Sequence, residues 1–443
     1  MSSLTATDIL RMADEERVQL VRLQFTDILG TTKNITIAMN QLETALKNGI
    51  MFDGSSIQGF VRIQESDMYL KPDPNTFCIF PWQSHGKKVA RLICDVYTAD
   101  DQPFAGCPRG VLKRMTEKAA SLGYTMFVGP EPEFFLLKTS EDGTPIIETN
   151  DRGGYFDLSP VDKGEAAREE IVFALQTMGF LVEASHHEVA PGQHEIDFKY
   201  EDAITTADNI STFRNVTKMI AQKHGLYASF MPKPIVGENG SGMHIHQSLF
   251  RNSHNAFYDE SDSIGLSEEA RWYLAGLLNH APAFTAITNP LINSYKRLVP
   301  GYEAPVYIAW SSSNRSSLIR IPAASGAGTR LELRSPDPSA NPYLALAVSL
   351  AAGLDGIENQ MPLGPECTDN IFSMTEAERD AASIPSLPGS LEKALAELQA
   401  DKVIQEALGS HVYENFVKAK TIEWDRYRTQ VHQWELDEYL ALT

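Results

Sequence analysis

The stretch "HHEVAPGQHEID" (residues 186–197) gathers three histidines and three carboxylates within twelve positions. Pro191-Gly192 at its centre predicts a turn, and the residues on either side predict two antiparallel strands. If the turn contains only these two residues, Glu188 lies directly opposite Glu195. Two like charges that face each other across a strand pair destabilise the pair. A cation held between the two carboxylates would remove this conflict, so the hairpin indicates a binding site.

Three further predicted strands place polar side chains on one face, because side chains two positions apart along a strand share a face. These side chains are Glu131 and Glu133 in "GPEPEFFLL", His244, His246 and Ser248 in "GMHIHQSLF", and Arg330, Glu332 and Arg334 in "RLELR". Exposure to solvent would explain one such strand. Three of them, together with the hairpin, favour one shared site.

Five glutamates and one histidine form the predicted metal-binding set: Glu131, Glu133, Glu188, Glu195, Glu332 and His244. Sets dominated by carboxylates suit Mg²⁺ or Mn²⁺. Zinc held by His186, His187 and His194 is the alternative. His186 and His187 are adjacent, however, and point to opposite faces of a strand, so we expect these histidines to pack or to form hydrogen bonds. Spacing alone leaves open which glutamates share an ion.

The composition excludes several classes of partner. The chain has 443 residues, a net charge of −20 and a computed pI near 5.0, which argues against nucleic acid or an anionic membrane as a general partner. The N-terminal residues lack a signal-peptide pattern, and the apolar run at 343–354 is too short to span a bilayer. The four cysteines are widely spaced, which predicts thiols in a reducing compartment. We therefore expect a cytoplasmic protein.

Residues 291–340 depart from this acidic background. They contain six basic residues and three acidic ones. Because the segment is apolar and rich in glycine rather than polar, a solvated face with scattered arginines is the weaker interpretation. The segment instead predicts a site for a phosphate or a carboxylate.

The pattern of strands and helices predicts a mixed α+β chain. The first hundred residues predict strands at 18–27, 33–39, 75–82 and 87–97, and one helix at 41–49. The turn-rich residues 99–110 predict a boundary. Beyond it, helices are predicted at 164–179, 203–224, 267–285 and 339–355, and the chain after about residue 370 is expected to be mostly helical. We expect an antiparallel sheet that carries the chemistry, with helices packed outside it.

Seven motifs occur in the order in which a known enzyme family has them. They are "FDGSS" (52–56), "GPEPEFFL" (129–136), "ASHHEVAPGQHEID" (184–197), "NGSGMHIHQSL" (239–249), "NSYKRLVPGYEAP" (293–305), "NRS" (314–316) and "RLELRSPDPSANPYLAL" (330–346). Together they make the chain resemble type I bacterial glutamine synthetase, from about residue 10 to the end, and in particular its shorter alpha-type branch. The resemblance implies a small N-terminal β-grasp domain at 1–103. It also implies a large catalytic, ATP-binding domain at 104–443, with a curved antiparallel sheet flanked by helices.

The activity that this resemblance implies is an ATP-dependent glutamate–ammonia ligase. Glutamate would accept the γ-phosphoryl of ATP, and ammonia would displace phosphate from the γ-glutamyl phosphate to give glutamine. Two or more Mg²⁺ or Mn²⁺ ions would serve each site. By the family pattern, Glu133, Glu188 and Glu195 would hold one ion, and Glu131, His244 and Glu332 the second, over the ATP phosphates.

The resemblance also assigns the substrate contacts. The glutamate contacts would be Asn239, Gly240, Arg297, Glu303, Arg315 and Arg334, and the ATP contacts would be Glu183, His246, Ser248, Arg315, Arg320 and Arg330. Asp53 would take a proton from ammonium, since only neutral ammonia is nucleophilic, and Tyr155 and Glu188 would help to form the ammonium site. Glu303 lies on the expected flap (293–305), which would exclude water from the acyl phosphate.

Assembly and regulation are implied in the same way. The family forms a homo-dodecamer of two hexameric rings, in which Asp53 would complete the site of a neighbouring subunit. Residues 370–395 contain no tyrosine, which excludes adenylylation there. Arg62 would take part in feedback inhibition by glutamine; the alternative is a surface ion pair with Glu65 or Asp67. A nitrogen-regulatory repressor protein is a further possible partner.

Three other functions fit parts of the sequence. A ligase of the same fold could act on another amine, but Asp53, Tyr155 and Glu188 favour ammonia. An inactive relative would not keep every metal, arginine and flap position filled with the expected residue type. A metal-dependent phosphohydrolase would leave the flap and the glutamate-binding arginines without a purpose.

Overall fold

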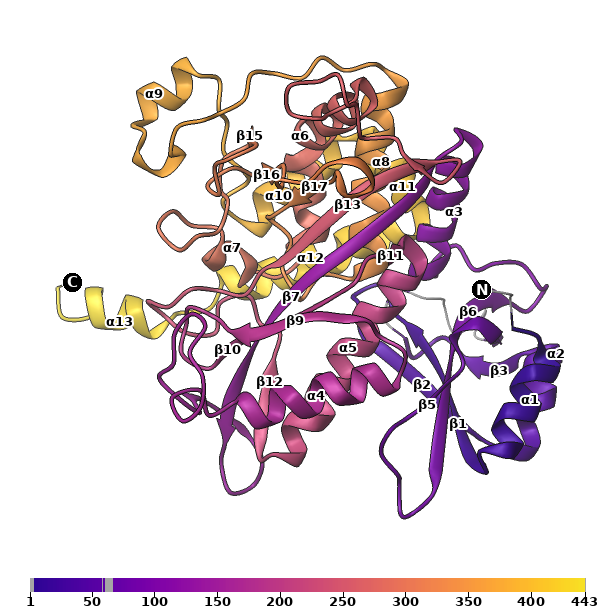
Figure 1. Cartoon of the computed structure of the whole chain (residues 1–443). Coiled ribbons are helices and arrows are strands. Elements are labelled where there is room, and N and C mark those ends of the chain that lie inside the picture. The colour runs from indigo at the N-terminus through magenta and orange to yellow at the C-terminus, as the bar shows by residue number, and fades with distance from the viewer. Residues whose placement is uncertain (1–3, 58, 60–66, 443) are drawn as a thin grey trace.

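The computed structural model describes residues 4–57, 59 and 67–442, and these form two β-sheets with helices around them (Figure 1). The predicted regulatory residue Arg62 lies outside the described residues. Within the described residues, no helix is both long enough and apolar enough to cross a membrane.

The N-terminal sheet has the strand order β2-β1-β6-β4-β3, and β5 pairs with β6. Its strands are β1 (Val18–Thr26), β2 (Thr32–Ala38), β3 (Ile50–Asp53), β4 (Asp67–Pro72), β5 (Cys78–Ile79) and β6 (Lys88–Thr98). Two helices accompany it, α1 (Ala6–Glu15) and α2 (Leu42–Asn48), so the prediction of a single helix was wrong. The signal for α1 was present, because Thr5 and Asp8 form a capping box at its start.

The larger sheet has the strand order β15-β16-β17-β13-β7-β10-β9 and is antiparallel except for the short pair β15 and β16. Its strands along this path are β7 (Thr125–Thr139), β9 (Val182–His187), β10 (Gln193–Phe198), β13 (Met243–Arg251), β15 (Trp310–Ser311), β16 (Ile319–Arg320) and β17 (Leu331–Leu333). Shorter strands pair with β7 or β13: β8 (Pro145–Thr149), β11 (Glu201–Asp202), β12 (Leu226–Ser229) and β14 (His254–Asn255).

Strand β7 is continuous through Pro130 and Pro132. Proline lacks the N–H that a ladder requires, and so it is tolerated only where no neighbour needs that donor. On one edge of β7, β11 pairs with Phe127 and Val128, and β10 pairs from Glu133 onward. Pro130 and Pro132 lie between these two pairings, where no strand of the described part of the chain pairs with this edge of β7. The sheet is therefore open at this point between β7 and β10.

The hairpin between β9 and β10 has a different register from the predicted one. His186 pairs with Glu195, and the Glu188 N–H donates to the Gln193 carbonyl (2.7 Å), so Glu188 does not face Glu195. Pro191-Gly192 occupies the centre of a turn closed by the Gln193 N–H and the Ala190 carbonyl, with Gly192 at φ +66°. This turn splays the strands, and the register moves by two residues. A shift of two keeps every side chain on its face, so Glu188 and Glu195 still share one.

Helices cover the larger sheet on the side away from the hairpin's polar face. The long helices are α3 (Pro108–Ser121), α4 (Glu165–Thr177), α5 (Ala203–Lys223), α6 (Glu268–Thr288) and α8 (Pro342–Glu358), and the four predicted helices beyond the boundary correspond to α4, α5, α6 and α8. The C-terminal region is mostly helical, as predicted: α9 (Glu376–Ala381), α10 (Leu391–Ala400), α11 (Lys402–Leu408), α12 (Ser410–Arg428) and α13 (Gln433–Tyr439). Helix α13 extends away from the body of the chain (Figure 1).

Arg109 joins the N-terminal region to helix α5 through one buried guanidinium group. It contacts Asp73 (2.8 Å) and Asp95 (2.9 Å) of the N-terminal region and Asp208 (2.9 Å) on α5. Removing one partner from such a buried charged group is costly, because the remaining charge loses its compensation. The network therefore fixes the position of the N-terminal sheet relative to the helices behind the larger one.

Candidate active site

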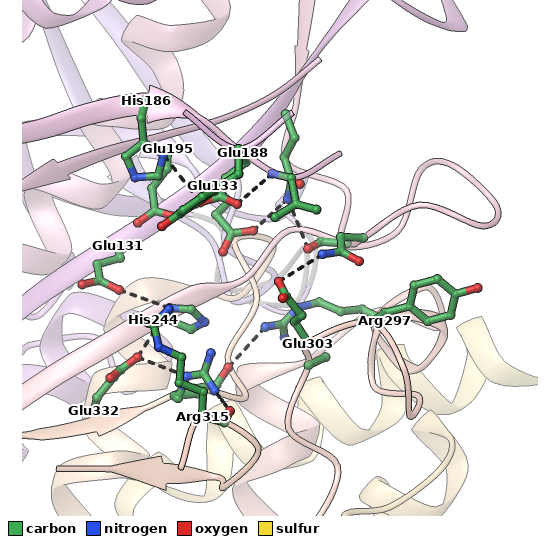
Figure 2. A pocket seen from close by; sticks show the side chains of 18 of the residues that line it. Glu131, Glu133, His186, Glu188, Glu195, His244, Arg297, Glu303, Arg315 and Glu332 are labelled. Carbon is green, nitrogen blue, oxygen red and sulfur yellow. Dashed lines mark hydrogen bonds and ion pairs between the residues drawn. The ribbon is translucent and has the colours of Figure 1, made fainter. Parts of the chain in front are cut away.

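The exposed face of the larger sheet contains a polar cavity of about 380 Å³. All six predicted metal ligands line it: Glu131, Glu133, Glu188, Glu195, His244 and Glu332. They come from β7, from the β9–β10 hairpin, from β13 and from β17, as the alternation pattern predicted. Figure 2 shows that their side chains converge on one space, with Arg315 beside His244 and Glu332, and Arg297 beside Glu303. We call this space the acidic cavity.

Glu133, Glu188 and Glu195 form the first carboxylate group in the acidic cavity. Burial, and then the charge of Glu188, raises the pKa of Glu133 to about 8. Burial, and then the charge of Glu133, raises the pKa of Glu195 far above its usual range. Such shifts mean that these carboxylates cannot all be ionised at neutral pH without a compensating positive charge. This donor set fits a hard divalent cation.

Gln193 holds the first group in place, and the sequence analysis did not identify it. Its side-chain amide donates to Glu133 (Nε2–Oε2 2.8 Å), and its Oε1 accepts from the Ala190 N–H (3.2 Å). The Gly242 N–H also donates to Glu133 Oε2 (2.9 Å). Gln193 is two positions before Glu195 on β10, so the alternation rule applied to the hairpin could have found it.

Glu131, Glu332 and two histidines form the second group. Glu131 contacts His244 (Oε2–Nδ1 3.1 Å) and His246 (Oε1–Nε2 2.7 Å), and His244 Nδ1 lies 3.7 Å from Glu332 Oε1. Burial raises the pKa of Glu131, but hydrogen bonds from the two histidines outweigh it, and the net pKa is lowered. Ligand atoms of Glu131, His246 and Glu332 lie within 4.8 Å of one another. The structure thus brings His246 to this group alongside the predicted His244.

The arginines lie beside these carboxylates. Arg334 Nε donates to Glu332 Oε1 (3.1 Å), and Arg320 donates to the other oxygen of Glu332. Arg297 is buried and donates to the Ser335 carbonyl (Nη1–O 2.7 Å), which fixes its guanidinium at the cavity wall. Guanidinium groups therefore lie among the carboxylates of the cavity wall, an arrangement that suits a bound anion.

Glu303 has an unusual backbone conformation. Its φ is +59°, a region that residues other than glycine rarely adopt, and its carboxylate accepts from Asn239 Nδ2 (3.2 Å). Backbone strain of this kind persists only where the surroundings enforce it, and it is common at functional loops. Glu303, Asn239 and Gly240 all line the acidic cavity.

A second cavity, of about 390 Å³, adjoins the first; we call it the nucleotide-side cavity. Of the predicted ATP contacts, Glu183, His246, Ser248 and Arg330 line it, with Phe127 and Tyr200 providing aromatic surface. Arg330 Nε donates to His246 Nδ1 (3.1 Å). Arg315 and Arg320 line the acidic cavity instead. Glu131 and Asp197 line both cavities, and the sequence analysis had not named Asp197 as a site residue.

Two predicted residues, Tyr155 and Asp53, lie at or beyond the edge of these cavities. Tyr155 lines the acidic cavity, is 51% exposed, and stacks on Phe156 (ring centroids 3.9 Å apart). Asp53, at the end of β3, is exposed and accepts hydrogen bonds from Ser55 (N 2.8 Å, Oγ 2.6 Å). Asp53 lines neither cavity of its own chain. Arg62 is not among the described residues.

His187 and His194 belong to the other face of the hairpin. His187 contacts Asp151 (Nε2–Oδ1 3.2 Å), and His194 Nδ1 lies 2.9 Å from Arg168 Nη1. Both histidines are fully buried. His186 lies on the cavity face, 3.6 Å from Glu188 (Nδ1–Oε1). The two adjacent histidines therefore do point to opposite faces, as predicted.

Two models of known protein families match most of this chain. A model described as "Glutamine synthetase, catalytic domain" matches residues 105–439, and one described as "Glutamine synthetase, beta-Grasp domain" matches residues 17–99. The chain belongs to the glutamine synthetase family. Its activity is that of a glutamate–ammonia ligase, an ATP-dependent enzyme that requires divalent metal ions.

Individual relatives and structures agree with this family. The glutamine synthetase of Clostridium saccharobutylicum is 59% identical over 440 residues, which cover 99% of each chain. That of Staphylococcus aureus (strain MW2) is 58% identical over 439 residues, 99% of this chain and 98% of the relative. The solved structure titled "GmaS/ADP complex-Conformation 1" has a TM-score of 0.90 at 33% identity, covering 98% of this chain and 100% of that one. The cryo-EM structure of Plasmodium falciparum glutamine synthetase has a TM-score of 0.87 at 26% identity, covering 99% and 100%.

The raised pKa of Glu133 predicts how the stability of this ligase depends on pH. An unfolded glutamate has a pKa of about 4.3, whereas Glu133 in the metal-free fold has a pKa of about 8. The stability that its protonated form provides is complete below the unfolded pKa and is lost as the pH rises through 8. The melting temperature of the metal-free protein should therefore fall between pH 6 and 9, and Mg²⁺ should raise it more at pH 9.

Glu133→Gln tests this prediction by calorimetry. The variant should show a smaller fall in melting temperature from pH 6 to 9 and bind Mg²⁺ at least about tenfold more weakly. Glu148→Gln on β8 removes an exposed carboxylate that pairs with Lys138 and should behave like the parent protein. A pH dependence and Mg²⁺ response that Glu133→Gln leaves unchanged would contradict the assignment.

Proposed function

We propose that glutamate binds in the acidic cavity and ATP in the nucleotide-side cavity, so that the γ-phosphoryl group passes between them. The observation that carries this proposal is that Glu131 lines both cavities. A carboxylate is a poor electrophile, and phosphorylation makes its carbonyl open to attack by ammonia. The products are then glutamine, ADP and phosphate.

Two or more Mg²⁺ or Mn²⁺ ions would occupy the two carboxylate groups of this site. Glu133, Glu188 and Glu195 would hold one ion, and Glu131, His244 and Glu332 the other. When bound, such ions neutralise charge on the phosphate and carboxylate oxygens that the reaction brings together. Glu131 also keeps His244 and His246 oriented through its two hydrogen bonds.

The basic residues of the acidic cavity would bind glutamate. Arg297, Arg315 and Arg334, with Asn239 and Gly240, provide donors that match a carboxylate geometrically, as arginine does better than lysine. Glu183, His246, Ser248 and Arg330, together with Arg315 and Arg320 from the acidic cavity, would contact ATP. Glu303 on segment 293–305 would close the cavity against water, which otherwise would hydrolyse the acyl phosphate.

Asp53 would accept the proton of ammonium in the cavity of a neighbouring subunit. Its exposure, and its absence from both cavities of its own chain, support this placement. Tyr155, half exposed at the cavity edge, and Glu188 would complete the ammonium site. The assembly would be a homo-dodecamer of two hexameric rings, built from a β-grasp domain at 1–103 and a catalytic domain at 104–443.

Regulation would follow the alpha-type branch of the family. The absence of tyrosine from 370–395 removes adenylylation in that segment and leaves feedback inhibition by glutamine, with Arg62 involved. A cytoplasmic location and a nitrogen-regulatory repressor as partner remain predictions from the sequence.

An assay with ATP, glutamate, ammonium and Mg²⁺ tests the proposed reaction. Glutamine and phosphate should form in equal amounts, and neither should form when glutamate is omitted. Phosphate release that is independent of both glutamate and ammonium would instead indicate a hydrolase.

Mixing two inactive variants tests the shared site. Asp53→Ala should lose ammonia-dependent turnover, and Glu332→Gln should lose phosphoryl transfer. A reassembled one-to-one mixture should recover about a quarter of the parent activity, because random pairing of neighbours leaves that share of sites intact. No recovery in a mixture that assembles normally would place Asp53 within the site of its own chain.

Arg62→Ala tests the regulatory proposal. Glutamine should inhibit the parent protein, and the variant should require a several-fold higher glutamine concentration for the same inhibition, with unchanged turnover in its absence. Identical inhibition curves for the variant and the parent protein would contradict the regulatory role and favour the surface ion pair instead.

A further inference from the structure

The opening between β7 and β10 places one more carboxylate in the site. Backbone pairing between these strands ends at Glu195 and Glu133, and Pro130 and Pro132 cannot extend it. Asp197 lies two positions beyond Glu195 on β10 and therefore shares its face. It is located where the acidic cavity meets the nucleotide-side cavity and lines both of them.

The contacts of Asp197 leave part of its carboxylate unused. Its side chain hydrogen-bonds to that of Glu195, which requires a proton shared between two carboxyl groups. Its Oδ1 is buried and has no hydrogen-bond partner. Within residues 4–57, 59 and 67–442, no basic side chain forms an ion pair with it; His244 and His246 pair with Glu131, and Arg320 pairs with Glu332. Burying an unpaired carboxylate oxygen costs free energy, and a cation would recover that cost.

The surroundings of Asp197 are also acidic. Glu131 lines both cavities together with Asp197, and Glu188 and Glu195 line the acidic cavity beside them. A residue that served only to hold the hairpin would not need to be a carboxylate here. The adjoining backbone pairs, Asp197 with Ala184 and Ile196 with Ser185, already fix the strand.

We propose that Asp197 is a further ligand for a divalent cation in this reaction, shared with Glu131 at the junction of the two cavities. The inference rests on the proposed metal site and adds a residue to it. A carboxylate at this position also repels the phosphates of ATP unless a cation lies between them. Asp197 thereby makes nucleotide binding dependent on the metal, and free ATP should bind poorly.

The variant Asp197→Asn separates this role from a structural one, because it keeps the shape and removes the charge. At pH 8 without divalent ions, its melting temperature should equal or exceed that of the parent protein, because the substitution removes one carboxylate from a group of carboxylates that repel one another. With saturating Mn²⁺ the melting temperature of the variant should instead be lower than that of the parent protein. Titration calorimetry should show Mn²⁺ binding weakened by about 10- to 100-fold. Free ATP, measured with a chelator present, should bind more tightly than it does to the parent protein.

Glu148→Gln is the matched control, since it removes an exposed carboxylate on β8 of the same sheet, and it should change none of these quantities. A lower melting temperature for Asp197→Asn without metal, combined with an unchanged Mn²⁺ isotherm, would make Asp197 structural and overturn the inference. Equal Mn²⁺ binding by variant and parent would overturn it while leaving the metal site intact. Failure of the parent protein itself to bind Mn²⁺ would overturn both proposals.

Discussion

The crowding of buried carboxylates on one face of the larger sheet is the constraint that organises this molecule. Burial raises the pKa of Glu133 and of Glu195, and the charge of a neighbouring carboxylate raises each of them further. A fold accepts such a conflict only if a proton or a cation resolves it. The rest of the site follows from that condition. Donors from Gln193 and Gly242 orient Glu133, and the guanidinium groups of Arg320 and Arg334 contact Glu332.

The opening in the larger sheet between β7 and β10 is the second feature on which the site depends. A fully paired edge between β7 and β10 would separate the two cavities with a continuous ladder. The two prolines of β7 interrupt that ladder while the pairing of β7 with β13 continues past them. Consequently Glu131 and Asp197 can face both cavities. The position of these two carboxylates therefore depends on the N–H groups that Pro130 and Pro132 lack.

The sequence predicted which side chains share the site more accurately than it predicted which residues pair across the strands. Alternation along strands placed Glu131, Glu133, His244 and Glu332 correctly, because that rule depends only on the two-residue period. The hairpin register was wrong, since the turn type of Pro191-Gly192 depends on contacts beyond the turn. Asp197 was overlooked because its importance comes from the opening between β7 and β10, which is a property of three strands together. Roles that require a second subunit, such as that of Asp53, lie beyond what one folded chain displays.

The hairpin also shows what the sheet can tolerate. The observed register differs from the simplest one by two residues, yet the functional face is the same. The pairing of the two strands can therefore shift by an even number of residues, because such a shift keeps each side chain on the same face of the sheet. A loop at 189–192 that grew or shrank by two residues would still direct His186 toward the cavity and His187 toward the core. A change of one residue in β9 would exchange them, placing an imidazole held by Asp151 in solvent and a cavity residue against buried aromatic rings. Changes in length are therefore expected in the loop at 189–192 rather than within β9.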